Sequence, residues 1–406
     1  MDSLITAAGR ALAAGDLLGV LSRVALREDP PALALRGIAM ARLGDFGRAK
    51  ELLKAAATAF GSKESTARAR CVLAEAEIAL VSRDLRWPTK RLDAARATLE
   101  KQGDWVNAAH ARHLEVRHFL LLGRLDEAER ALAFLDPTPF PPASRAAYEL
   151  VVAGIAIRRL RTAQAKTALA RAAQAAHLAG IAALEAEVES ARLVLDKPAG
   201  RLIVRGEERL VLLEHVEALR TSDAIVIDAC RNLVRHGDTV VSLTTRPILF
   251  SLARGLAEAW PADASRKALL ARAFRAKHAD DSHRARLRVE VGRLRAELRA
   301  LVDVEATKDG FALRSRGGGE IVVLAPPVED EHAAVLALLA DGEAWSSSAL
   351  ALALSVSQRT VQRALDALAA AGKAQPFGRG RARRWTASSV PGFPTTLLLP
   401  APLPGL

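Results

Sequence analysis

The sequence is poor in cysteine and in aromatic residues. Its 406 residues include two cysteines, Cys71 and Cys230, and aromatic side chains make up 4% of the chain. The cysteines lie far apart and match no metal-binding spacing, so we expect both to be small buried side chains in a reducing cytoplasm. The scarcity of aromatic residues argues against binding of single-stranded RNA, which relies on stacking of bases on aromatic rings.

Long hydrophobic runs are also missing. No stretch of 18 uncharged apolar residues occurs, and a helix needs about that length to cross a bilayer. The N-terminal sequence MDSLITAAGR lacks a charged segment leading into an apolar core, so we expect no signal peptide. These absences predict a cytoplasmic protein without a membrane partner.

Motifs for catalysis are absent as well. The sequence contains no G-x-S-x-G motif and no dinucleotide-binding fingerprint. The tri-glycine 317–319 lacks the Lys-Ser/Thr of a phosphate-binding loop and is interpreted as a hinge. His110, His113 and His118 fall in one helical segment with spacings of three and five, whereas a metal site favours histidines at i and i+4. We therefore expect no enzymatic activity, no cofactor and no metal.

Basic residues, by contrast, are abundant and unevenly placed. The formal net charge is +12 and the pI is about 10.3. The segment 357–385 carries seven basic residues against one acidic, and 245–316 carries sixteen against nine, while 317–356 has no basic residue. This distribution favours a polyanionic partner that contacts two separate parts of the chain.

Residues 346–385 predict two short helices joined by a tight turn and followed by a basic hairpin. The apolar contacts of the first helix are expected from Leu350, Leu352 and Leu354. Ser357 follows the turn, where its side chain can cap the second helix by accepting a hydrogen bond from a free N–H group.

The second helix has one apolar and one polar face. Val361, Leu365 and Leu368 follow at i, i+4 and i+7 and therefore share a buried face. The opposite face can pair with base edges and phosphates in a major groove, and the arginines of GRGRARRW can lie along a phosphate backbone. The expected DNA contacts here are Ser357, Gln358, Arg359, Thr360, Gln362, Arg363, Arg379, Arg381, Arg383 and Arg384.

This combination resembles the winged helix-turn-helix of bacterial transcription regulators, with a recognition helix after Ser357 and a wing at 378–385. The resemblance implies that double-stranded DNA is the partner and that sequence is read mainly by the helix. A small helical domain with a solvated basic face is the alternative that the same residues allow.

A second segment, 197–319, changes from helical to strand-like periodicity after the break at Lys197–Gly200. Its sequence predicts several strands, three helices (247–260, 266–277 and 282–301) and a closing hairpin. The segment resembles the OmpR/PhoB-type winged helix, but no phosphoacceptor receiver precedes it. In its third helix Leu287, Val291, Leu294 and Leu298 form the expected inward stripe, and Arg284, Arg286, Arg288 and Arg293 are the expected DNA contacts. A structural or dimerising role of a degenerate winged helix is the alternative.

The first 196 residues predict amphipathic helices broken by small-residue turns. Gly15 and Gly44 stand 29 residues apart, and small residues such as Gly37 recur where two helices must approach closely. The segment resembles tetratricopeptide (TPR) arrays with irregular repeats, which implies a protein or peptide partner. An irregular helical bundle without a repeat groove remains the alternative.

We therefore predict a mainly α protein. A TPR-like helical repeat array (1–196) precedes two α+β winged helix-turn-helix domains (197–319 and 320–389). The apolar, proline-rich tail (390–406) cannot fold alone and is expected to lie extended over this chain or over a partner. The predicted function is sequence-specific DNA binding in transcription regulation, with a homodimer compatible with the fold. A scaffold that uses all three domains to bind proteins is the competing hypothesis.

Overall fold

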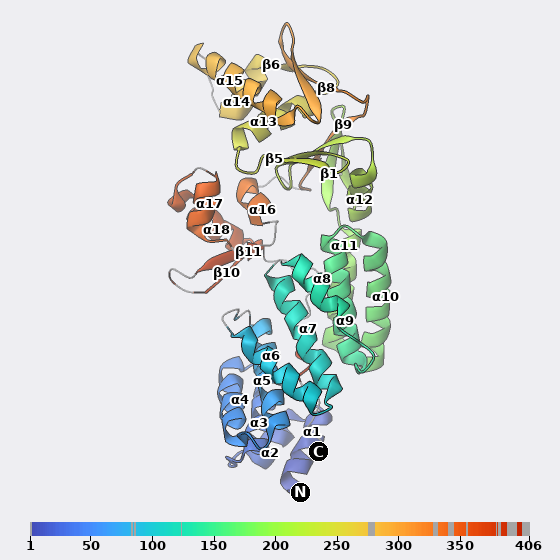
Figure 1. Ribbon diagram of the computed structural model, residues 1–406, viewed down its shortest axis with the longest axis vertical. Helices are drawn as coiled ribbons and strands as arrows, with labels where there is room; N and C mark the ends of the chain where they lie inside the picture. Colours follow the sequence, from blue (N-terminus) through green and yellow to red (C-terminus); the bar gives the residue numbers. More distant parts are fainter. Residues whose placement is uncertain are drawn as a thin grey trace.

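The structure is a computed structural model, and it is mainly helical with small sheets (Figure 1). It describes residues 2–82, 84, 87–122, 124–274, 281–327, 332–339, 345–354, 356–378, 380, 383–387 and 396–399. No helix among these residues combines the length and apolar character that a membrane crossing requires.

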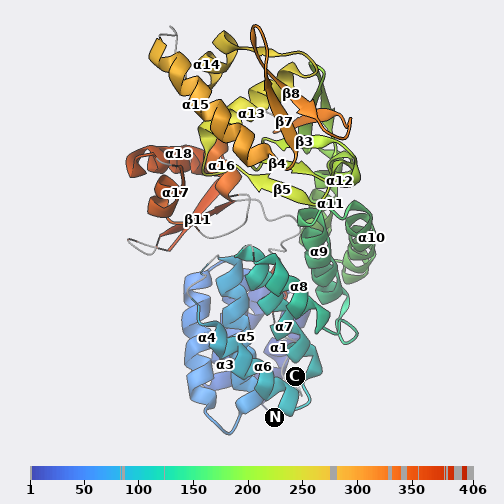
Figure 2. The same cartoon turned by 45° about the horizontal axis from the view of Figure 1, so that its top comes forward.

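The N-terminal part folds into consecutive helices that pack on their sequence neighbours, here called the helical array (Figures 1 and 2). Its helices are α1 Ser3–Ala13, α2 Leu17–Val24, α3 Pro30–Arg42, α4 Phe46–Phe60, α5 Ser65–Val81, α6 Thr89–Lys101, α7 Trp105–Leu121, α8 Leu125–Ala133, α9 Pro142–Arg158, α10 Thr162–Ala179 and α11 Ala182–Asp196.

A Gly-Asp pair marks three of the turns in the helical array. Gly15, Gly44 and Gly103 have φ of 79°, 87° and 73°, a backbone conformation that favours glycine. The aspartate that follows each glycine caps the next helix by accepting a backbone N–H. The turns at Gly15 and Gly44 are predicted from the sequence, whereas the turn at Gly103 is not.

Gly37 shows why small residues recur at helix contacts. A Cβ atom added there would lie 2.8 Å from Cγ of Leu53, closer than side-chain carbons normally approach. Glycine therefore allows α3 and α4 to pack at short range, as the sequence predicted.

A mixed six-stranded sheet follows α11, in the order β2-β1-β9-β3-β4-β5. Its strands are β1 Gly200–Val204, β2 Glu207–Val211, β3 Ile225–Asp228, β4 Leu233–His236, β5 Thr239–Ser242 and β9 Ile321–Ala325, and α12 Leu213–Thr221 lies between β2 and β3. β9 pairs antiparallel with β1 and parallel with β3. The predicted domain boundary at 319/320 is therefore wrong, because it separates a central strand from its sheet. The helix α12 was not predicted.

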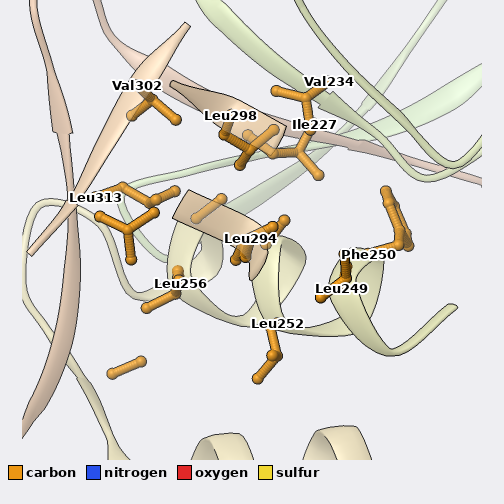
Figure 3. Packing of buried hydrophobic residues seen from close by; sticks show 14 of the residues in the cluster. Ile227, Val234, Leu249, Phe250, Leu252, Leu256, Leu294, Leu298, Val302 and Leu313 are labelled. Carbon is orange, nitrogen blue, oxygen red and sulfur yellow. The ribbon is translucent and has the colours of Figure 1, made fainter. Parts of the chain in front are cut away.

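Three helices and a small sheet complete this unit. They are α13 Pro247–Ala259, α14 Arg266–Phe274 and α15 Asp281–Leu298, with β6 Ala264–Ser265, β7 Val302–Ala306 and β8 Gly310–Ser315 in the order β6-β8-β7. One core joins the helices to both sheets: Ile227 and Val234 of the large sheet and Leu313 of the small sheet pack with Leu252 and Leu294 (Figure 3). Residues 200–325 therefore form one packing unit.

The C-terminal unit contains α16 Ala333–Leu339, α17 Ser347–Leu354, α18 Gln358–Ala370 and the antiparallel pair β10 Ala374–Phe377 and β11 Arg384–Ala387. Backbone hydrogen bonds of 2.9 and 2.8 Å also join Trp345 to Trp385. The predicted stripe Val361, Leu365 and Leu368 is buried.

One apolar contact predicted for this unit is wrong. Leu350 and Leu354 are buried, whereas Leu352 is 84% exposed. Residues two apart in a helix point to different sides, while residues four apart share a face. Leu352 therefore cannot join its two neighbours in the core.

Candidate nucleic-acid interface

Helix α18 begins at a well-formed cap. Ser357 has extended backbone geometry, and its Oγ accepts a hydrogen bond from the backbone N–H of Thr360 at 3.1 Å. The Thr360 hydroxyl lies 2.8 Å from the same oxygen. The cap predicted from sequence is confirmed, and it fixes the first turn, whose free N–H groups and helix dipole favour a nearby anion.

Two arginines stand on the outer side of the first two turns of α18. Arg359 and Arg363 are exposed, and neither takes part in an ion pair or hydrogen bond with the described residues. Their spacing of four residues places both guanidinium groups on one face. They are therefore available to pair with an external partner.

The two glutamines of the predicted interface are held by neighbours instead. The side-chain N–H of Gln358 donates to Oγ of Ser347 at 3.1 Å, which links α18 to α17. Gln362 donates to Oδ1 of Asp366 at 2.8 Å. This second bond was not predicted, although the i, i+4 spacing indicates it. Either amide has to leave its partner before it can read a base.

The hairpin after α18 carries further positive charge. Arg383 is exposed, and its guanidinium carbon lies 4.5 Å from the centre of the Trp385 ring. Arg384 is half-buried and donates to the backbone carbonyl of Arg383 at 3.1 Å. The predicted contacts Arg379 and Arg381 lie outside the described residues. The two described arginines stand at the start of β11, in the same unit as α18.

Helix α15 carries the second predicted set. Leu287, Val291, Leu294 and Leu298 are buried as expected, and Arg284, Arg286, Arg288 and Arg293 are exposed. Arg293 forms an ion pair with Glu290 at 2.8 Å, and the Arg286 guanidinium lies 4.7 Å from the centre of the Phe274 ring. The leucine stripe belongs to the core of residues 200–325, while α18 packs in the C-terminal unit. The structure therefore presents the two basic sets on separate units.

Two of the histidines of α7 have different surroundings. His110 contacts a carboxylate oxygen of Glu77 at 3.1 Å, whereas His113 is fully buried with no hydrogen-bond partner for its ring nitrogens among the described residues. Within the described part of the chain, no group of three or more potential metal-binding side chains converges.

His113 gives the helical array a pH dependence. Burial, together with the nearby positive charge of Arg117 and with His110, lowers the pKa of His113 well below 6.5. The unfolded chain takes up this proton below pH 6.5 and the folded array does not. Stability is therefore fully present above pH 6.5, and it should fall by about 1.4 kcal/mol per pH unit below that value.

Hydrogen exchange of the amides in α5 and α7, measured between pH 5 and 7.5 and corrected for intrinsic rates, tests this dependence. We expect His113→Phe, which keeps a ring in the core, to reduce the slope of the free energy of unfolding against pH by about 1.4 kcal/mol per pH unit, the value for one proton. His177→Phe, at a histidine whose side chain is 87% exposed, is the matched control and should keep the slope. Equal slopes in all three proteins would contradict the assignment to His113.

No protein-family model, no curated protein and no solved structure matches this chain.

Proposed function

We propose that the chain is a sequence-specific DNA-binding regulator of transcription. In this proposal α17, α18 and the β10–β11 hairpin act as a winged helix-turn-helix, and α15 belongs to a second, OmpR/PhoB-type winged helix without a receiver domain. The helical array, whose successive helices resemble TPR repeats, binds a protein or peptide partner.

The exposed pair Arg359 and Arg363 carries the proposal. A guanidinium group can donate two hydrogen bonds to O6 and N7 of a guanine in the major groove. Two such groups on the first turns of a capped helix can reach adjacent bases, while Arg383 and Arg384 on the hairpin can hold the phosphate backbone. Asp366 is occupied by Gln362, so the two arginines of α18 have no ion-pair partner among the described residues and favour an anionic partner.

Selection from a random double-stranded DNA library at two salt concentrations, with sequencing of the bound fraction, tests the proposal. We expect an enriched motif that survives the higher salt. A palindromic motif would indicate that two copies bind as a homodimer. Binding without a motif, or no binding at either salt, would contradict a sequence-specific regulator, and the latter result would favour the protein-binding scaffold.

Two substitutions should separate base reading from phosphate contact. Arg359→Ala should reduce discrimination between the motif and unrelated DNA by about 1–3 kcal/mol. Arg383→Ala should weaken all sequences alike and lower the slope of log affinity against log salt by about one. Both effects are measured by titration of labelled duplexes at several salt concentrations.

Arg192→Ala provides the control for loss of one positive charge. This arginine lies on α11, with a side chain that is 56% exposed, and its removal should leave both discrimination and salt dependence unchanged. Equal losses on every sequence from Arg359→Ala and Arg383→Ala would show that α18 does not read bases.

A further inference from the structure

A short piece of the C-terminal tail, residues 396–399, lies against the helical array. The backbone N–H of Thr396 donates to Oε1 of Glu187 on α11 at 2.9 Å. The N–H groups of Leu398 and Leu399 donate to Oε1 and Oε2 of Glu77 on α5 at 2.9 and 2.7 Å. The tail therefore joins two helices that lie more than 100 residues apart in the sequence.

Glu77 is a fully buried carboxylate with partners on two sides. His110 and Arg117 of α7 contact it from within the array, at 3.1 and 3.5 Å. Burial alone would raise the pKa of Glu77, but these two side chains and the N–H of Leu398 outweigh it and hold the pKa at about 2. The group is thus a carboxylate anion, and two consecutive backbone N–H groups converge on it.

Apolar side chains of the tail also pack against the helical array. Leu399 is 6% exposed and packs in the cluster that includes Leu33, Leu53 and Ile78, and Leu397 packs partly buried against the same cluster. The φ of Leu399 is 57°, a left-handed conformation that leucine rarely adopts and that surrounding contacts must maintain. A tail in solvent would have no contacts to offset the free-energy cost of this backbone conformation.

The two acceptors of the tail and the arginine that contacts Glu77 lie on three helices of the array. Glu77, Arg117 and Glu187 belong to α5, α7 and α11. In stacked helix pairs, one helix of each pair lines the inner face. The tail therefore lies where such an array would bind an extended peptide.

We propose that the surface around Glu77 and Glu187 is a binding site for an extended, uncharged peptide, and that residues 396–399 are its intramolecular ligand. The site recognises two consecutive backbone N–H groups and a leucine side chain that packs in the cluster that includes Leu33. This proposal does not depend on DNA binding by the chain.

The proposal has a quantitative consequence. A tethered ligand has an effective concentration on the order of millimolar when its linker is short, and residues 388–395 are all that separates Ala387 of β11 from Thr396. A free copy of the tail must compete with that concentration. The unaltered chain should therefore bind a free tail peptide at least about tenfold more weakly than a chain whose own tail is displaced.

The test uses a fluorescent synthetic peptide of residues 390–406 and fluorescence anisotropy with the full-length chain. Leu399→Asp in the protein puts a carboxylate into the apolar cluster that holds the Leu399 side chain, which should displace the tail. We therefore expect this variant to bind the free peptide at least about tenfold more tightly than the unaltered chain does. Leu26→Asp makes the same change at a leucine that is 97% exposed and should bind as the unaltered chain does.

Peptides with one methylated backbone nitrogen make the test specific for the carboxylate contact. Methylation at the position of Leu399 removes the N–H that faces Glu77 but keeps the side chain, and it should abolish binding to the Leu399→Asp protein. Methylation at Leu397, whose N–H has no acceptor among the described residues, is the control and should bind. Equal binding of the two methylated peptides would overturn the site.

Circular dichroism identifies a Leu399→Asp protein that has lost its helices. In that case Leu398→Pro, which deletes one N–H donor and leaves Leu399 in place, replaces it in the same titration. If neither variant binds the free peptide more tightly than the unaltered chain does, the proposal is contradicted. Light scattering of the unaltered chain should show a monomer. A dimer that Leu399→Asp dissociates would instead show that the tails are exchanged between two copies, and the intramolecular assignment would then be wrong.

Discussion

Trp385→Ala should unfold the C-terminal unit. Trp385 is 1% exposed and packs in the cluster that contains Leu350, Leu365 and Leu368. Truncation of a buried tryptophan to alanine costs about 3–5 kcal/mol, because apolar contacts are lost and a cavity remains. A unit as small as residues 332–387 has on the order of 3–8 kcal/mol of stability in all. The substitution therefore removes most of that stability.

Hydrogen exchange of the amides in α17 and α18 measures this loss directly. We expect their protection to fall to near that of an unfolded chain, while the amides of α13 and α15 keep theirs, because those helices belong to a different core. Leu352→Ala is the control, since this leucine of α17 is 84% exposed and should change stability by less than about 0.5 kcal/mol. Full protection of α18 in Trp385→Ala would show that Trp385 does not hold the unit together.

Local signals explain why much of this unit could be predicted from the sequence. A serine before an apolar stripe, a glycine after it and a short hairpin act over a few residues, and α18 begins and ends where they indicate. The exposure of Leu352 is also contained in the sequence, because the helical period places leucines spaced by two on different sides of a helix.

Contacts between distant parts of the chain could not be predicted in the same way. β9 is a five-residue apolar run between a tri-glycine and two prolines, and its partners β1 and β3 lie about a hundred residues earlier. Nothing in its own composition selects those partners, since parallel pairing depends on the whole sheet. The domain boundary was placed wrongly for this reason.

The tail contact also depends on residues that are distant in the sequence. The sequence indicated that residues 390–406 would lie extended over this chain or over a partner, and the described residues 396–399 do lie on this chain. Their acceptor Glu77 could not be recognised, because a glutamate in an alanine-rich helix usually faces solvent. Its burial follows from His110, Arg117 and the tail together, and none of these is close to it in sequence.

Glu77→Gln should be the most damaging single substitution in the helical array. It removes a charge from a network in which Arg117 is also fully buried, and a buried charge that loses its partner costs about 3–5 kcal/mol. The pKa of about 2, against an ordinary value of 4.5, corresponds to roughly 3 kcal/mol, which agrees with that range. This contribution is present above pH 4.5 and is lost as the pH falls towards 2.

The double variant Glu77→Leu with Arg117→Met separates the two roles of Glu77. An apolar pair can replace a buried ion pair at little cost, so we expect hydrogen exchange in α5 and α7 to return most of the protection that Glu77→Gln loses. The N–H groups of Leu398 and Leu399 still lack their acceptor in this variant, so the free tail peptide should not bind even when Leu399→Asp is also present. Recovery of both stability and peptide binding would show that apolar packing alone holds the tail. If neither stability nor peptide binding recovers, the ion pair of Glu77 and Arg117 also holds His110 and Glu187 in place.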